Sequence, residues 1–246
     1  MSNIIQKKLK QYFWVVPVVY ILSAIFLLRS KVQYIYLAAS AMTILTVIVH
    51  RYANSKPDIS LARWLAVLAA IGISAAVILS IEKIAILSEP AHVASCSLSP
   101  VVACSPIIAS PQASAFGFPN SFIGIFGFSA VLTAAMTIAA GATALTRAWW
   151  RTLLGGITFG AAFCIWLLYQ GVFDIGKLCL YCMLVWLITF AMLWLVAAYC
   201  VNNKHINFGK NINKLLGFKY ELITATYVLI FMLLFYRWSD YWLSLF

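Results

Sequence analysis

Long apolar stretches constrain this chain more than any other feature. Seven stretches are apolar enough to be membrane helices, and they cover roughly residues 11–28, 33–49, 62–83, 119–145, 151–172, 177–201 and 220–238. A helix needs about 20 apolar residues to cross a bilayer. Barrel strands run only about 10 residues and alternate between apolar and polar positions, so they do not fit. The sequence therefore predicts an all-α integral membrane protein.

The composition agrees with this fold class. Hydrophobic residues make up 64% of the chain and charged residues 9%, whereas soluble domains carry roughly 25% charged residues. A net charge of +11 could indicate nucleic-acid binding. The basic residues, however, lie in short loops beside the apolar stretches, as the positive-inside rule requires. We therefore expect contact with membrane lipid and no nucleic-acid partner.

The basic residues also predict which loops share a side. Alternate connections hold 12 of the 17 lysines and arginines: Lys7, Lys8, Lys10, Arg51, Lys56, Arg63, Arg147, Arg151, Lys204, Lys210, Lys214 and Lys219. The positive-inside rule assigns these connections to the cytoplasm. The connector 84–118 and the start of the 177–201 stretch then lie together on the opposite side, which is the periplasm or its equivalent.

Four cysteines fall on that opposite side, in two pairs. Cys96 and Cys104 lie in the connector, and Cys179 and Cys182 form a Cys-Leu-Tyr-Cys at the start of an apolar stretch. Disulfides persist in such a compartment. Thiol–disulfide exchange needs an attacking thiolate, a disulfide within reach and a second thiol that resolves the intermediate. Two pairs on one face can supply all three and pass electrons between them.

The Cys-x-x-Cys has a favourable local setting. On a helix the two sulfurs lie one turn apart, and the helix N-terminus favours a thiolate. Lys177 would add positive charge, whereas Asp174 would oppose it if it lay close. A zinc site would require a second closely spaced cysteine pair or a histidine pair as further ligands, so we predict no metal site. We interpret Cys164 and Cys200 as small buried apolar residues.

The connector has an unusual composition. Five of the seven prolines lie between residues 89 and 119, and most other residues there are Ala, Ser, Val or Ile. This is too apolar for an open loop in water, so we expect a partly helical lid on the bundle. A mobile lid suits a cysteine pair that must reach two partners. A static disulfide that only pins the lid is the alternative. Elsewhere, the small residues Gly156 and Gly160 predict close helix packing.

Three polar or aromatic residues lie near the cysteines in this arrangement. Asn120 is either a helix cap or a hydrogen-bond donor to a buried ligand. Ser110 is either a turn former or a contact for a thiol or ligand. Trp186 follows Cys182 by one helical turn. It is either an interfacial tryptophan or an aromatic wall beside a planar ligand.

The order of these residues resembles the vitamin K epoxide reductase (VKOR) family and its bacterial homologues, over about residues 61–201. The cysteine pair with eight-residue spacing is followed by Ser110 and by Asn120-Ser121, and Cys179 and Cys182 then open a later span. The DsbB family does similar chemistry but has its Cys-x-x-Cys first. The resemblance implies a four-helix bundle around a quinone pocket, capped by the connector. Two N-terminal helices in 1–60, and a cytoplasmic loop and last helix in 202–246, would add about three transmembrane helices.

The resemblance also implies a role for each cysteine. Cys182 would lie nearest the quinone and donate electrons to it, with Cys179 as its disulfide partner. Cys104 would attack or resolve at Cys179. Cys96 would face outward and exchange with a thioredoxin-like protein.

Three further residues would contact the quinone or support its chemistry. Asn120 would donate a hydrogen bond to a quinone oxygen, and Ser110 would be a lid serine linked to that chemistry. Trp186 replaces the tyrosine of the vertebrate enzymes, and an indole donates one hydrogen bond but accepts none. This difference argues against assuming an epoxide substrate.

The resulting hypothesis is a membrane thiol–disulfide oxidoreductase. It would oxidise a thioredoxin-like or DsbA-like periplasmic protein and pass two electrons to ubiquinone or menaquinone, which supports disulfide bond formation. We expect no fused thioredoxin domain, so the redox partner would be a separate protein. We also expect the protein to lie in a bacterial inner membrane with its active site facing the periplasm. The alternatives are a vitamin-K-type quinone or epoxide reductase fed by external thiols, and a non-enzymatic membrane protein with structural disulfides.

Overall fold

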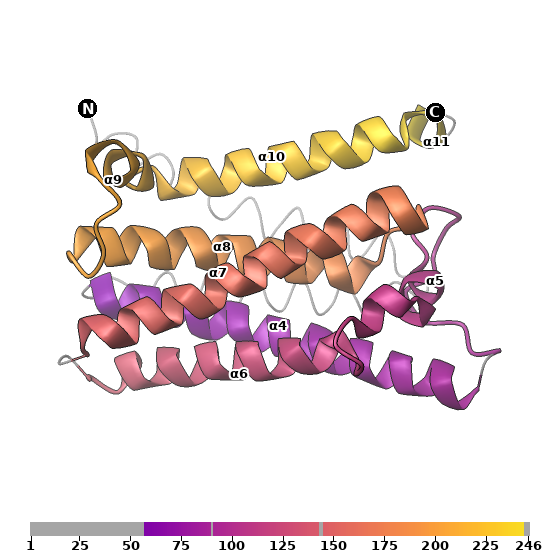
Figure 1. Cartoon of the computed structure of the whole chain (residues 1–246), viewed down its shortest axis with the longest axis horizontal. Coiled ribbons are helices and arrows are strands. Elements are labelled where there is room, and N and C mark those ends of the chain that lie inside the picture. Colours follow the sequence, from indigo (N-terminus) through magenta and orange to yellow (C-terminus); the bar gives the residue numbers. More distant parts are fainter. Residues whose placement is uncertain (1–56, 90, 143–144, 244–246) are drawn as a thin grey trace, which may run out of the picture. The chain divides into compact units, whose positions relative to one another are not determined.

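The computed structural model describes residues 57–89, 91–142 and 145–243 (Figure 1). The chain divides into two compact units, residues 1–60 and 61–246. The description below concerns the second unit. The expected spans 11–28 and 33–49 lie outside the described residues.

Five helices of the described residues are long and apolar enough to cross a membrane. They are α4 (Pro57–Ser88), α6 (Asn120–Ala139), α7 (Arg147–Tyr169), α8 (Leu180–Asn202) and α10 (Lys219–Arg237). The shorter helical elements are α5 (Cys104–Ala109), the 3₁₀ turn η1 (Pro111–Ser114), the π-helical turn η2 (Gln170–Ile175), α9 (Lys210–Leu216) and α11 (Ser239–Leu243). These elements confirm the predicted all-α membrane protein.

Four of the long helices share one core. Leu65 of α4, Ala135 of α6, Ile157 of α7 and Met192 of α8 are all buried in the same apolar cluster. This is a four-helix bundle, as predicted.

The helix α10 is an addition to that bundle. It packs against α8, and α7 crosses α8 diagonally in Figure 1. The Tyr227 hydroxyl of α10 donates to the Leu187 carbonyl of α8 at 2.6 Å, and the Trp194 indole of α8 donates to Thr226 Oγ1 of α10 at 3.0 Å. No residue of α10 is buried in the described structure.

Contacts near the helix ends show which loops lie at each end of the bundle. The helix α7 begins after Thr146, whose hydroxyl accepts a hydrogen bond from the Trp149 amide and caps the first turn. The Arg151 side chain nearby donates to the His205 carbonyl at 3.3 Å. The basic first turns of α7 and the basic loop after α8 therefore lie at one end, as the charge pattern predicts, and the connector between α4 and α6 lies at the other (Figure 1).

The far end of α7 changes geometry before the Cys-x-x-Cys. The last turn is π-helical, and Gly176 follows with φ of 65°, a left-handed conformation that favours glycine. Arg237 at the end of α10 donates to the Val172 carbonyl of this turn at 3.2 Å. The turn redirects the chain toward the start of α8, where Cys179 lies.

Candidate functional site

The connector between α4 and α6 folds back as a lid, which we define as residues 91–119. It begins later than the sequence predicts because α4 continues to Ser88. The lid contains α5 and η1, so the prediction of a partly helical lid is confirmed. Pro106 lies in the first turn of α5, where a missing N–H costs no helical hydrogen bond.

A short backbone pairing joins the lid to the start of α8. The Ala103 amide donates to the Leu178 carbonyl at 2.9 Å, and the Leu178 amide donates to the Val101 carbonyl at 2.9 Å. The result is a parallel bridge between Val102 and Leu178. Cys104 and Cys179 each follow a residue of this pairing, so the pairing places them side by side.

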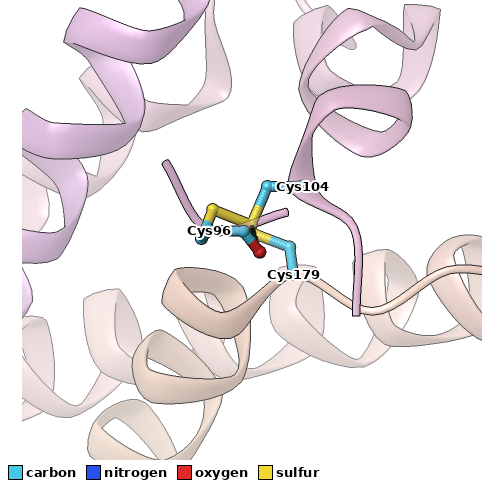
Figure 2. Close-up of side chains that lie close together, drawn as sticks. All are labelled: Cys96, Cys104 and Cys179. Carbon is cyan, nitrogen blue, oxygen red and sulfur yellow. Dashed lines mark hydrogen bonds between the residues drawn. A yellow bond between two sulfur atoms is a disulfide. The ribbon is translucent and has the colours of Figure 1, made fainter. Parts of the chain in front are cut away.

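Three sulfurs meet at this point. The Sγ atoms of Cys96, Cys104 and Cys179 all lie within 4.8 Å of one another, and their side chains converge in Figure 2. Cys96 and Cys104 form a disulfide, whereas Cys179 and Cys182 are free thiols. The structure therefore brings the two predicted pairs together at one end of the bundle.

The expected outward position of Cys96 is wrong for this structure. Cys96, Cys104 and Cys179 each expose 0% of their surface. They form one buried cluster with Ala94 and Ile108 of the lid. The apolar lid residues cover the disulfide, so an external thiol reaches Cys96 only when the lid moves.

Cys179 occupies the N-cap position of α8. Its sulfur accepts a hydrogen bond from the Cys182 amide at 3.4 Å. The hydrogen bond from the Cys182 thiol does most to lower the pKa of Cys179, and the amides of Cys182 and Tyr181 lower it further, although burial opposes them. The site thus favours the Cys179 thiolate, which is the form that attacks disulfides.

The two charged residues before Cys179 are engaged with the lid. The Lys177 ammonium donates to the Pro100 carbonyl at 2.7 Å, and Asp174 accepts a hydrogen bond from the Gln112 side chain. Both contacts fasten the lid to the segment that leads into α8.

The three clustered sulfurs are close enough to hold a metal ion. Cys96 and Cys104 are bonded to each other, however, so only Cys179 among them offers a thiolate ligand in this redox state. The geometry fits disulfide exchange better than metal binding.

A cavity of about 950 Å³ lies beside Cys182. Such a volume suits a small-molecule ligand. Most of the lining is apolar, and it comes from α4, the lid, α6, α7 and α8. The predicted residues Ser110, Asn120, Cys182 and Trp186 all line it.

Asn120 does not cap its own helix, so that alternative is wrong. The N-cap residue of α6 is Pro119, and no side-chain hydrogen bond caps the first turn of this helix. The Asn120 amide instead donates to the Gln112 carbonyl at 2.7 Å, and its oxygen accepts from the Ala115 amide at 3.0 Å. It fastens the lid to α6 and retains a second N–H for other contacts. Ser110 donates to the Ile107 carbonyl at 2.7 Å, which is the turn-forming role.

Trp186 is buried, with 4% of its surface exposed. It packs with Val172 and Phe190 and also lines the cavity one turn beyond Cys182. Its indole N–H has no hydrogen-bond partner among the described residues. The indole can therefore act as an aromatic wall and can offer one hydrogen bond.

The two glycines of α7 do not bring helices into close contact, so that prediction is wrong. Both line the cavity. A Cβ atom added at Gly156 would meet nothing within 4 Å, and one at Gly160 would lie 3.7 Å from Thr189 Cγ2. The absence of side chains leaves room in the cavity at these two positions.

Sequence reasoning missed two neighbouring residues of α4. The Glu82 carboxylate accepts hydrogen bonds from the Ser95 amide and hydroxyl and contacts His92 Nε2 at 2.8 Å. The Lys83 ammonium donates to the Ile108 carbonyl at 2.7 Å. The sequence feature that could have identified these two residues is a pair of charges at the end of an apolar stretch. Buried charges in a membrane helix commonly have a functional role.

A bundle of membrane-spanning helices that buries two cysteine pairs beneath a lid, next to an apolar cavity, defines a membrane protein with a thiol–disulfide centre. The sequence model of the Vitamin K epoxide reductase family matches residues 63–197, and the chain belongs to this family. No curated protein matches the chain. The matched segment contains both cysteine pairs, and α10 lies outside it. Family membership indicates a membrane oxidoreductase with quinone chemistry.

Proposed function

We propose that this protein oxidises the dithiol of a separate thioredoxin-like protein and passes two electrons to a membrane quinone, which supports disulfide bond formation. The observation that carries the proposal is the cluster of three sulfurs within 4.8 Å, with Cys182 one helical turn away in the wall of a large apolar cavity. The arrangement supports a path for electrons from a lid disulfide to a ligand dissolved in the membrane.

The first half of the reaction is exchange at the lid. A partner thiolate attacks the Cys96 sulfur, which breaks the Cys96–Cys104 bond and releases the Cys104 thiolate. The second partner thiol then attacks the mixed disulfide, so the partner leaves oxidised and the lid pair is reduced. Since Cys96 is buried, this half-reaction requires the lid to open.

The second half passes the electrons inward. The Cys104 thiolate attacks Cys179 of an oxidised Cys179–Cys182 pair, and Cys96 then resolves the bond and restores the lid disulfide. The Cys179 and Cys182 thiols give two electrons and two protons to the quinone, which leaves as quinol while their disulfide forms again. The redox state in the structure, a lid disulfide beside two free thiols, fits the stage just before quinone reduction.

The cavity supports a quinone as the oxidant. Its lining is mainly apolar, and the few polar groups include the free N–H of Asn120 and the indole N–H of Trp186. Both donate to carbonyl oxygens. A quinone presents two such oxygens on a planar ring, and that pattern matches donors on an apolar wall.

The test is the purified full-length protein mixed with a reduced thioredoxin-like protein and either ubiquinone or menaquinone, with quinone absorbance followed over time. The proposal predicts one quinone consumed per partner disulfide formed, and the preferred quinone identifies the oxidant. If partner thiols stay reduced while both quinones are present, the proposed function is wrong. If vitamin K epoxide is reduced and neither quinone is, the family's epoxide chemistry replaces it.

A further inference from the structure

We propose that Lys83 is a catalytic residue that binds the quinone oxygen and stabilises the negative charge that develops there during reduction. This inference rests on the proposed function and adds a residue to its quinone site. It is drawn from the position of one buried cation in the wall of the cavity.

Lys83 is buried in the described structure, with 7% of its surface exposed. Its ammonium makes one hydrogen bond, to the Ile108 carbonyl at 2.7 Å. Among residues 57–89, 91–142 and 145–243 it forms no ion pair, because the adjacent Glu82 carboxylate is turned toward His92 and Ser95. An ammonium has three donors and no acceptor, so two N–H groups remain.

The remaining donors matter because Lys83 lines the cavity that holds Cys182, Asn120 and Ser110. A charge held in an apolar membrane helix is costly and is retained where it pairs or serves a function. Coulomb interactions are also stronger there than in water, since few polar groups screen them. A ligand oxygen that gains negative charge is the partner this cation fits.

Quinone reduction produces such an oxygen. Two electrons leave the Cys179 and Cys182 thiols as their disulfide forms, and they enter the quinone ring. The ring oxygens carry negative charge until each takes up one of the two thiol protons. The Lys83 ammonium donates a hydrogen bond to one oxygen during this interval and is still protonated when the quinol leaves.

The neighbouring Glu82 offers a matched control. It also lies near the end of α4 and also fastens the lid, through Ser95, but it does not line the cavity. A substitution at Glu82 therefore disturbs the attachment of the lid without removing a group from the quinone site. The two positions separate a role in chemistry from a role in holding the lid.

The experiment measures two half-reactions in the purified full chain carrying Lys83→Gln, Lys83→Arg or Glu82→Gln. One is reduction of the lid disulfide by dithiothreitol, and the other is oxidation of the pre-reduced protein by a soluble ubiquinone analogue. Glutamine at position 83 keeps a donor for the Ile108 carbonyl but carries no charge. We expect Lys83→Gln to slow quinone reduction about 10- to 100-fold, the scale of losing one charge-stabilising donor.

Dithiothreitol should reduce the lid disulfide of Lys83→Gln at the wild-type rate, which would show that this variant is folded. Lys83→Arg should recover most of the wild-type rate of quinone reduction. Glu82→Gln should show the opposite pattern, with faster lid reduction and normal quinone reduction. Equal slowing of the quinone step in Lys83→Gln and Glu82→Gln, or no slowing in Lys83→Gln, would overturn the inference while the proposed function stands. Failure of the wild-type protein to reduce soluble analogues of both ubiquinone and menaquinone would overturn both the inference and the proposed function.

Discussion

Val102 of the lid pairs through its backbone with Leu178, the residue before the Cys-x-x-Cys. This pairing is the only β-bridge among the described residues, and it holds Cys104 next to Cys179. Two residues separated by more than seventy positions in the chain thus meet through two backbone hydrogen bonds. The register of that pairing decides which lid sulfur faces α8.

Breaking this pairing should slow the internal transfer of electrons. Ala103 has φ of −139° and donates to the Leu178 carbonyl. Proline at this position fixes φ near −65° and removes the donor. We expect Ala103→Pro to slow turnover with the dithiol partner, while oxidation of the pre-reduced protein by quinone keeps its rate. Stopped-flow absorbance of the two reactions checks this, and equal rates for the variant and the wild type in both would contradict it.

Cys182→Ala should abolish quinone reduction by the dithiol partner, because Cys179 then lacks the cysteine with which it forms the disulfide beside the quinone. Quinone absorbance during turnover is the measurement. Cys200→Ala is the control, since Cys200 is a buried thiol in the core shared by the four helices and lies away from the cavity lining. Full quinone reduction by Cys182→Ala would remove this cysteine from the proposed path.

Cys104→Ala should block transfer from the lid to Cys179 and leave quinone binding intact. Cys96 is then a free thiol with no intramolecular partner. It should attack the disulfide of an oxidised thioredoxin-like protein and release one partner thiol, so the mixed disulfide should accumulate and appear on non-reducing gels. Quinone binding, measured by equilibrium titration, should match the wild-type value. Unaltered turnover without Cys104 would exclude the lid pair from electron transfer.

The pKa of Cys179 should lie below the ordinary thiol value of about 8.5. A lowered pKa means that the thiolate persists to lower pH, so its ultraviolet absorbance should titrate below the ordinary range. The measurement uses a variant that retains only Cys179 and Cys182. Replacing Cys182 by alanine removes the largest stabilising hydrogen bond and should move the midpoint upward. A midpoint that does not move would show that this bond is unimportant.

Filling the cavity at Gly156 should weaken quinone binding. A Cβ there meets no atom within 4 Å, so leucine fits the backbone and projects into the cavity. We expect Gly156→Leu to raise the KM for quinone at least several-fold. Gly155→Leu is the matched control, because Gly155 has equally open surroundings but does not line the cavity. Equal KM values in the two variants would place the quinone elsewhere.

The sequence predicts the features that depend on local pattern. The described transmembrane helices follow from the length of the apolar stretches, and the charge pattern correctly places both cysteine pairs at one end of the bundle. The order of the cysteines and of Asn120 also identifies the family. These signals are strong because a bilayer tolerates few polar residues in a spanning helix.

The contacts that depend on the folded lid could not be predicted in this way. The burial of Cys96, the bonds from Asn120 to the lid and the separate partners of Glu82 and Lys83 arise where the lid folds back on the bundle. Such contacts join residues distant in sequence and have no periodic signature. The glycines of α7 show the same limit, because small residues permit close packing but equally leave space for a ligand.

The most direct test of the account is to trap the bond between the lid and α8. A variant with Cys96→Ala and Cys182→Ala leaves Cys104 and Cys179 without their usual partners. Mild oxidation followed by mass spectrometry of the digested monomer should find a Cys104–Cys179 disulfide in most molecules. Two free thiols, or disulfides only between separate chains, would contradict the claim that these sulfurs meet during turnover.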